Sequence, residues 1–391
     1  MTTTLWASLA VILYAYAGYP LFIWILAWLR PQRCNSASTT PSVSIVMAVH
    51  NGQSLLPRKI EHLLALDYPN VKEIIIVSDG STDKTAELLS SYHNPLLKTI
   101  ALADHRGKAV AVNAGMSAAS GDVIFFVDIR PEIQPGTMQK MVNFFADSRV
   151  GCVAGDLLLV QDGHDTVSAA VGGLYWRYEQ WIRKCEATYD SPVGVYGGCY
   201  AIRRELATAQ PAGMILDDMF QPLSIIRQGY RSVFASGAFV YDKWPKSVAG
   251  EFDRKVRTLA GNFQLIQMAP WILTPQNRVL LQFISHKLLR LIVPYLLVIA
   301  LVSTCILSVG SVFYAVFAAI QICALTMSIA GLYVKIPVLD RLIAPAGAMM
   351  VLNVAAVVGL YKFFATRGPL WKIWKPGGTA VIESMPPARE I

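Results

Sequence analysis

This chain has few of the residues on which redox, zinc and disulfide proteins depend. Of its 391 residues only six are cysteine and six are histidine, and charged residues make up 15%. The cysteines are scattered without any Cys-x-x-Cys pair and the histidines form no cluster, so neither a zinc site nor a disulfide framework is predicted. No block of lysine and arginine interleaved with aromatic residues indicates nucleic-acid binding.

Hydrophobic sequence is in excess, at 54% of the residues, and it is concentrated at the two ends of the chain. Residues 5–29 form one uncharged apolar run, followed by Arg30 and Arg33. Such a run is long enough to cross about 30 Å of hydrocarbon. Because the basic residues follow the run, we predict a transmembrane helix within residues 1–30 instead of a cleaved signal peptide, with the next segment in the cytoplasm.

Further apolar runs near the other end predict a C-terminal transmembrane region over residues 286–365, followed by a tail of residues 366–391. The runs are residues 288–307, 313–334 and 342–364. Lys287 and Arg290 mark the cytoplasmic side of the first run. Three spans would place the tail outside, yet the tail is basic, which leaves open whether one of these segments is re-entrant or interfacial.

The net charge of +8 favours anionic partners, such as phospholipid headgroups, a nucleotide or a phosphate-linked lipid. Roughly half of this excess is attributable to the usual bias of positive residues toward the cytoplasmic side.

Between the two apolar ends, a polar linker (residues 31–42) leads into a domain that we predict over residues 43–285. Its first part alternates apolar runs with helical patterns, in the order β-α-β-α-β-α-β. Strands that are apolar throughout indicate a parallel sheet covered by helices on both faces, with ligands bound beyond the carboxyl ends of the strands. The polar residues at these ends are His50, Asn51, Asp79 and Asp128.

Polar groups at several strand ends favour a nucleotide site, although the sequence lacks both Gly-x-Gly-x-x-Gly and Gly-x4-Gly-Lys-Ser/Thr. Without such a loop, nucleotide phosphates need another counter-charge. A divalent metal held by Asp128 would supply it, because Mg²⁺ takes one or two protein carboxylates and completes its shell with phosphate and water. Alternatively, Asp79 forms an Asx turn, and Asp128 caps a local turn or pairs with Arg130.

The domain resembles glycosyltransferase family 2, whose members are inverting enzymes with the GT-A fold, a Rossmann-like mixed sheet. The stretches that carry the resemblance are "VSIVMAVHNGQSLLPRKIEHLLALDYP", "EIIIVSDGSTDKTAE", "RGKAVAVNAGMSAASGDVIFFVDIR" and "MILDDMFQPLSIIRQGYRSVF". Near the ends, "YAGYPLFIW" and "FISHKLLRLIVPYLL" are similar to the membrane-bound bacterial branch that includes cellulose, hyaluronan and poly-N-acetylglucosamine synthases.

The resemblance implies a UDP-sugar site with Mg²⁺ or Mn²⁺ as cofactor. Asp128 matches the first Asp of the metal-binding Asp-x-Asp motif of the family, and Arg130 stands at the second position. Residues implied to contact the nucleotide or its diphosphate are His50, Asn51, Asp79, Lys108, Asn113 and Arg254.

The same resemblance assigns catalysis to Asp218, as the base, with Asp217 beside it. An inverting transfer needs one carboxylate to accept the proton of the attacking hydroxyl, and two adjacent carboxylates raise one pKa toward a useful value. The alternative is that either residue caps a helix over residues 219–228. Arg257 matches the arginine of the Gln-x-x-Arg-Trp motif of processive synthases, whereas Thr258 replaces its tryptophan.

We therefore expect a glycosyltransferase in the inner (plasma) membrane, with its catalytic domain in the cytoplasm. Its partners would be a UDP-sugar, the membrane, and either a growing polysaccharide or a polyprenyl-linked acceptor, with possible export or assembly proteins. Three alternatives stay open: a non-processive transferase on a lipid-linked oligosaccharide, a nucleotide-dependent oxidoreductase, and a transport or export subunit without catalysis. The oxidoreductase predicts a glycine fingerprint that the sequence lacks.

Overall fold

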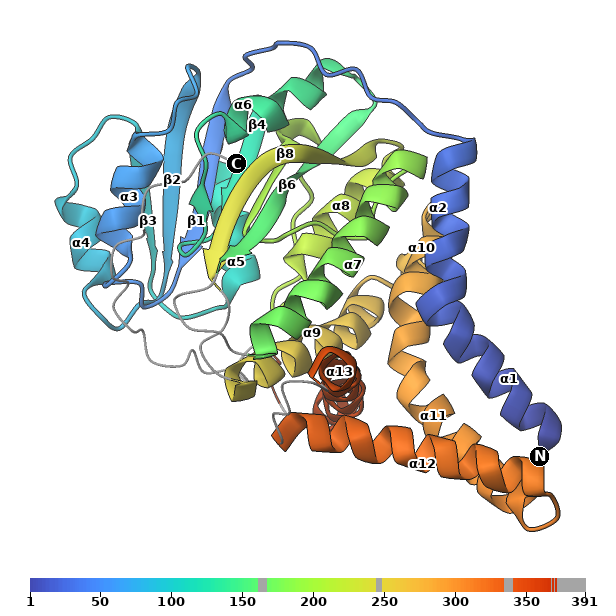
Figure 1. Cartoon of the computed structure of the whole chain (residues 1–391). Coiled ribbons are helices and arrows are strands. Elements are labelled where there is room, and N and C mark those ends of the chain that lie inside the picture. Colours follow the sequence, from blue (N-terminus) through green and yellow to red (C-terminus); the bar gives the residue numbers. More distant parts are fainter. Residues whose placement is uncertain (161–166, 244–247, 334–339, 367, 369, 371–391) are drawn as a thin grey trace.

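An eight-stranded mixed sheet forms the centre of the computed structural model, which describes residues 1–160, 167–243, 248–333, 340–366, 368 and 370. The strand order is β3-β2-β1-β4-β7-β6-β8-β5 (Figure 1). The strands are β1 (Val43–Val49), β2 (Val71–Asp79), β3 (Leu97–Leu102), β4 (Val123–Val127), β5 (Glu132–Ile133), β6 (Val150–Val160), β7 (Cys199–Arg203) and β8 (Arg231–Lys243).

The first four strands of this order are parallel, which confirms the predicted β-α-β-α-β-α-β unit. Beyond them the sheet becomes mixed, because β7 is antiparallel to both β4 and β6, while β6 and β8 are parallel. The α-helices are α1 (Thr2–Leu13), α2 (Tyr19–Leu29), α3 (Leu56–Leu64), α4 (Thr85–Ser91), α5 (Lys108–Ala118), α6 (Thr137–Val142), α7 (Val167–Tyr189), α8 (Asp217–Arg227), α9 (Val248–Met268), α10 (Leu280–Gln282), α11 (Leu289–Ser308), α12 (Val312–Tyr333) and α13 (Asp340–Ala365).

Strands are apolar on both faces because helices cover both faces of the sheet. Phe125 and Val127 of β4 join the core formed with α3 and α6, whereas Ile124 and Phe126 join the core formed with α5 and α8. This alternation is the two-residue period of a strand. Because helices cover both faces, every residue of β4 is buried and apolar, and polar residues are expected only where that cover ends. Asp128 is the first residue beyond that buried run.

Helix α8 begins two residues earlier than the sequence pattern predicted, at Asp217 instead of Met219. Leu216 occupies the N-cap position, and no side chain makes a capping hydrogen bond there. The capping alternative for Asp217 and Asp218 is therefore wrong, because both residues lie in the first turn, after the N-cap position, and the Asp217 carboxylate pairs with Lys108.

Four helices of the described residues are long and apolar enough to cross a membrane, as judged by length and composition. They are Thr2–Leu29, Leu280–Ser308, Val312–Ala330 and Ala346–Ala365. The first and second each contain a π-helical segment, Tyr14–Gly18 and Phe283–Leu288, which connects the α-helices into one run. The second helix starts at Leu280, eight residues before the predicted apolar run, because the charged residues near 287 interrupt the hydropathy but not the helix. The basic tail residues Lys372 and Lys375 lie outside the described residues.

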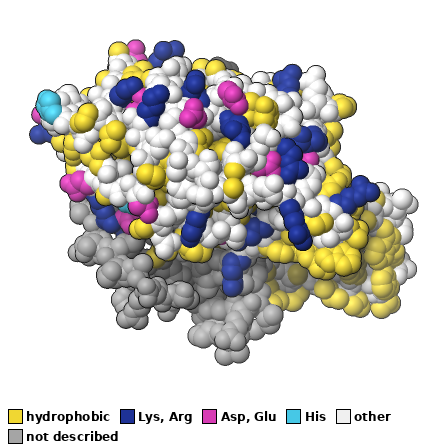
Figure 2. Space-filling model, turned by 90° about the horizontal axis from the view of Figure 1, so that it is seen from above, with side chains coloured by type: hydrophobic (Ala, Val, Ile, Leu, Met, Phe, Trp, Pro, Cys, Tyr) yellow, Lys and Arg dark blue, Asp and Glu magenta, His cyan; other side chains and the backbone are white. Residues whose placement is uncertain are grey.

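The long apolar helices pack against one another and against the sheet domain. Helix α1 packs on α11, α12 packs on α11 and α13, and α13 packs on α9 (Figure 1). The carboxyl ends of the parallel strands point toward α9, so the predicted ligand edge faces these helices. Figure 2 views the opposite side, where Lys, Arg, Asp and Glu side chains are dispersed and hydrophobic side chains gather mainly at the right-hand edge.

Candidate active site

The predicted ligand edge brings together side chains from β4, α5 and α8. Lys108, the first residue of α5, places its Nζ 3.0 Å from Oδ1 of Asp128 and 3.1 Å from Oδ2 of Asp217. The charges of these two carboxylates hold the pKa of Lys108 above its usual range, although burial acts in the opposite direction. One ammonium group therefore links Asp128, the residue after β4, to Asp217 at the start of α8, 89 residues later in the sequence.

Asp218 differs from its neighbour in its surroundings. Burial and the adjacent charge of Asp217 raise the pKa of Asp218 to about 6. No side chain of the described residues forms a hydrogen bond or an ion pair with its carboxylate, which is half-buried. Asp217 is neutralised by Lys108, whereas Asp218 keeps a carboxylate that can accept a proton near neutral pH.

Gly197 leaves room for the Asp218 side chain. A Cβ atom at position 197 would lie 3.0 Å from Cβ and 3.2 Å from Oδ2 of Asp218. The backbone N–H of Val195 also donates to the Asp218 carbonyl at 2.9 Å. The segment before β7 therefore contacts both the main chain and the side chain of Asp218.

The two arginines predicted on α9 have different surroundings. Burial lowers the pKa of Arg257, and the charges of Asp217, Asp218 and Asp128 oppose this change, which places its guanidinium within range of all three carboxylates. Arg254 instead lies 3.9 Å from Glu251 on its own helix. Of the two, Arg257 is the one whose position suits a diphosphate at this edge.

Asp79 positions a loop. Its carboxylate accepts hydrogen bonds from the backbone N–H groups of Arg106 and Gly107, both at 2.8 Å, and it lies 2.8 Å from Nδ1 of His105. Gly80 is required beside it, because a Cβ atom there would lie 2.2 Å from the His105 backbone nitrogen. Asp79 therefore fixes the loop that ends at Lys108, an organisation that the Asx-turn alternative did not include.

His50, Asn51 and Asn113 each contact a neighbouring loop. The His50 ring stacks on the His105 ring, with ring centres 3.7 Å apart. Asn51, in a left-handed conformation (φ 51°), accepts a hydrogen bond from the Thr82 N–H at 2.8 Å. Asn113 exchanges two hydrogen bonds with the backbone of Gln210. The two asparagine side chains thus hold loops together around the site, which the sequence did not indicate.

Arg130 does not pair with Asp128. Its guanidinium lies 3.2 Å from Oδ2 of Asp242, a buried carboxylate that also accepts a hydrogen bond from the Tyr196 hydroxyl at 2.9 Å. This arrangement explains how an arginine is tolerated two residues after Asp128. Asp242 and Tyr196 were not among the predicted site residues, because nothing local in the sequence connects them to β4.

The residues present can hold a divalent cation only with help from a ligand. The described residues contain no group of three or more His, Cys, Asp or Glu side chains that could hold a metal ion. Asp128 offers one carboxylate that is 34% exposed, at the edge where the donor phosphates are expected. Because Mg²⁺ takes one or two protein carboxylates and completes its shell with phosphate oxygens and water, this donor set fits the predicted metal.

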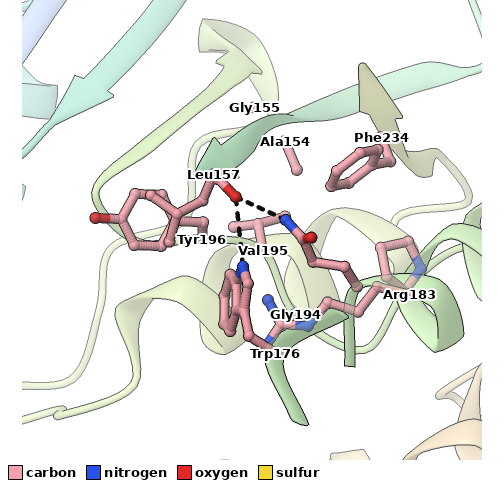
Figure 3. A pocket seen from close by; sticks show the side chains of 11 residues that line it. Ala154, Gly155, Leu157, Trp176, Arg183, Gly194, Val195, Tyr196 and Phe234 are labelled. Carbon is pink, nitrogen blue, oxygen red and sulfur yellow. Dashed lines mark hydrogen bonds between the residues drawn. The ribbon is translucent and has the colours of Figure 1, made fainter. Parts of the chain in front are cut away.

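A small cavity lies beside the Asp218 segment, between α7 and the sheet. It is lined by Trp176, Arg183 and Tyr196, among others (Figure 3). The Trp176 indole and the Gln180 amide both donate to the Leu157 carbonyl, at 3.4 and 2.7 Å. These bonds fasten α7 to β6 and leave the guanidinium of Arg183 in the cavity.

The fold and this set of carboxylates and cations are compatible with a glycosyltransferase, and comparison with known proteins shows this class. Residues 44–209 match the family model described as glycosyl transferase family 2, and residues 132–334, just over half of the chain, match glycosyl transferase family group 2. The chain belongs to glycosyltransferase family 2 and is a glycosyltransferase.

Individual relatives are more distant. Poly-beta-1,6-N-acetyl-D-glucosamine synthase of Staphylococcus aureus (strain COL) is 24% identical over 230 residues, covering 57% of this chain and 55% of the relative. An uncharacterized glycosyltransferase of Haemophilus influenzae is 31% identical over 118 residues, covering 30% of this chain and 47% of the relative. The chain thus spans about half the length of these curated relatives.

Among solved structures, a mannosyltransferase of Pyrobaculum calidifontis, determined with GDP-Man and Mn²⁺, has a TM-score of 0.68 and 21% identity. It covers 93% of this chain, and this chain covers 99% of it. The predicted fold class, a GT-A mixed sheet with apolar helices at both ends that could cross a membrane, is confirmed.

Proposed function

We propose that this membrane protein transfers a sugar from a UDP-sugar to a hydroxyl of a glycan or lipid-linked acceptor, with Asp218 as the base. The observation that carries the proposal is the contrast between two adjacent carboxylates. Asp217 is paired with Lys108 at 3.1 Å, while Asp218 has a raised pKa of about 6 through burial and the charge of Asp217. The pairing with Lys108 neutralises the Asp217 carboxylate and leaves the Asp218 carboxylate available to accept a proton.

The chemistry is a direct displacement that inverts the anomeric carbon. The acceptor oxygen forms a bond to that carbon as the bond from the carbon to the donor phosphate oxygen breaks. The nucleoside diphosphate leaves with the electron pair of the broken bond, and the acceptor proton passes to Asp218. Lys108 and Arg257 lie where they can hold the departing diphosphate.

Asp128 would hold Mg²⁺ or Mn²⁺ in this site. The bound cation would supply charge neutralisation for the diphosphate. Presence of Mn²⁺ with the nucleotide sugar in the Pyrobaculum mannosyltransferase is in keeping with this assignment.

We place the domain in the cytoplasm and the helices in the inner (plasma) membrane. Positive residues after the first apolar helix and around the second, including Arg30, Lys287 and Arg290, support this orientation. The names of the staphylococcal relatives support a polysaccharide as product, whereas Thr258 in place of the processive tryptophan supports a single addition to a lipid-linked acceptor. The length of the product separates these two outcomes.

Asp218→Asn tests the assignment of the base. We expect UDP release in the presence of acceptor to fall about 10²- to 10⁴-fold, because the acceptor proton loses its receiver. Donor binding, measured by calorimetry with a panel of UDP-sugars, should persist. Asp253→Asn, on the exposed face of α9, is the matched control and should keep full activity. Unchanged turnover in Asp218→Asn would show that another group is the base.

A further inference from the structure

Two cations near Asp218 come from α7 and from the second apolar helix. Arg183 of α7 and Lys287 of the Phe283–Leu288 segment both act electrostatically on Asp218, and both lower its pKa. They also lie within electrostatic range of each other, although they are far apart in the sequence. Their effect opposes the raised pKa that a base requires, so tuning the base does not explain their presence.

Neither cation has a strong carboxylate partner in the described part of the chain. Arg183 makes no ion pair there, and its guanidinium lies 5.8 Å from the centre of the Trp176 ring. Lys287 has Glu179 at 3.8 Å, which is a weak pairing. Figure 3 shows the Arg183 side chain directed into the cavity, toward Trp176.

Glu179 already serves other groups. It pairs with Arg290 through one carboxylate oxygen, and its second oxygen lies 3.1 Å from the His286 ring nitrogen. The next buried carboxylate, Glu186, is bonded to the Tyr19 hydroxyl at 2.6 Å and to the other His286 nitrogen at 2.8 Å. In the described part of the chain, the cations at positions 183, 287 and 290 have three carboxylates nearby, those of Glu179, Glu186 and Asp218. Asp218 would lose its charge on accepting the acceptor proton, and an anion would then complete the balance.

The depth of Lys287 indicates where this anion would come from. The helix Leu280–Ser308 has 29 residues, and its last 20, Leu289–Ser308, are sufficient to cross about 30 Å of hydrocarbon. Lys287 therefore lies at the level where the hydrocarbon gives way to lipid phosphates. A cation that is mostly buried at this depth is expected to face a partner.

We propose that Arg183 and Lys287 bind the phosphate of a membrane-anchored acceptor, a polyprenyl phosphate or diphosphate carrying the sugar to be extended. The proposal rests on the glycosyl transfer proposed above. It adds that the lipid phosphate lies near Asp218, because Arg183 lines the same cavity as Val195, whose N–H donates to the Asp218 carbonyl.

Direct binding of lipid tests the site without requiring turnover. The full-length protein is placed in phosphatidylcholine nanodiscs containing either polyprenyl phosphate or phosphatidylglycerol, and retained lipid is counted by native mass spectrometry. We expect the wild type to retain polyprenyl phosphate at least fivefold over phosphatidylglycerol, and Arg183→Gln and Lys287→Gln to lose this preference. Arg183→Lys should keep part of it, because the charge remains.

Lys184→Gln is the matched control, because Lys184 is the next basic residue of α7 but pairs with Asp156 at 3.4 Å. Equal retention of both lipids by the wild type, or equal loss in Lys184→Gln and Arg183→Gln, would overturn the site. Asp218→Asn separates the two proposals. If Asp218→Asn binds lipid normally, but neither the wild type nor any variant transfers sugar, then the proposed function fails and the lipid site stands. If transfer proceeds and Arg183→Gln binds lipid as the wild type does, the site fails alone.

Discussion

The carboxylate of Asp79 and the backbone N–H of Gly107 are joined by a hydrogen bond of 2.8 Å, which connects the end of β2 to the residue before Lys108. Because Lys108 opens α5 and contacts both Asp128 and Asp217, the position of its ammonium group depends on this connection. A residue at the end of one strand thus determines where the cation between two other elements lies.

Asp79→Ala should therefore impair the donor site through the loop. Two backbone N–H groups lose their acceptor, the part-buried one of Arg106 and the buried one of Gly107, and the buried group costs about 1–3 kcal/mol. We expect a lower melting temperature and a donor KM raised about tenfold, with a smaller change in kcat. Asp104→Asn, in the same loop but exposed, is the control. A normal donor KM in Asp79→Ala would contradict the role of this loop.

The rate should depend on pH through Asp218. Its pKa of about 6, raised by burial and by Asp217, means that the carboxylate is ionised above that pH and protonated below it. Because the base must be ionised, kcat should rise with pH through about 6 and then level off, with roughly a tenfold loss one unit below the midpoint.

Asp217→Asn provides the test of that midpoint. It removes the neighbouring negative charge, so the pKa of Asp218 should fall and the acidic limb of the kcat profile should move to lower pH. The charge of Lys108 is left less compensated, which acts in the same direction. An acidic limb that stays in place, or moves to higher pH, would argue against Asp218 as the titrating group.

Much of the fold could be predicted from local sequence. Apolar runs such as residues 43–49 and 123–127 are buried on both faces, and that burial is encoded in consecutive residues. The placement of Asp79 and Asp128 at one edge follows from parallel pairing, which the β-α alternation implies. The assignment of Asp217 and Asp218 depended on the family resemblance, since two adjacent aspartates are equally compatible with a helix cap.

What local patterns could not predict are contacts between elements that meet only after the domain has folded. The Asp242 carboxylate of β8 reaches Arg130, and the Glu179 carboxylate reaches His286 only because α7 packs near the start of the second apolar helix. Each of these contacts joins residues more than 100 positions apart, so no periodic pattern in the sequence predicts it. The close approach of Gly197 to the Asp218 side chain also arises only in the folded domain, so the sequence did not predict it.

Gly197→Ala should weaken catalysis without removing a functional group. The added Cβ atom would lie 3.0 Å from Cβ and 3.2 Å from Oδ2 of Asp218, so the carboxylate must move by a few tenths of an ångström. We expect kcat to fall about 10- to 100-fold, with donor affinity unchanged. Gly310→Ala, where a Cβ atom meets nothing within 4 Å, is the control. Equal kcat values for the two variants would show that Asp218 tolerates the shift.

The concentration of divalent cation that the enzyme needs for transfer should depend on the carboxylate of Asp128. Asp128 is a partly exposed carboxylate at this edge, and Nζ of Lys108 lies 3.0 Å from its Oδ1. Chelation by EDTA should abolish transfer, and Mn²⁺ or Mg²⁺ should restore it. In Asp128→Asn the concentration of Mn²⁺ needed for half-maximal rate should rise at least tenfold, because a neutral amide is a weaker ligand than a carboxylate. In Asp242→Asn that concentration should stay near the wild-type value, since Asp242 is occupied by Arg130 and Tyr196. If EDTA-treated enzyme keeps its full rate, or if both variants require the same Mn²⁺ as the wild type, Asp128 has another function, with Lys108 and Arg257 alone stabilising the leaving diphosphate.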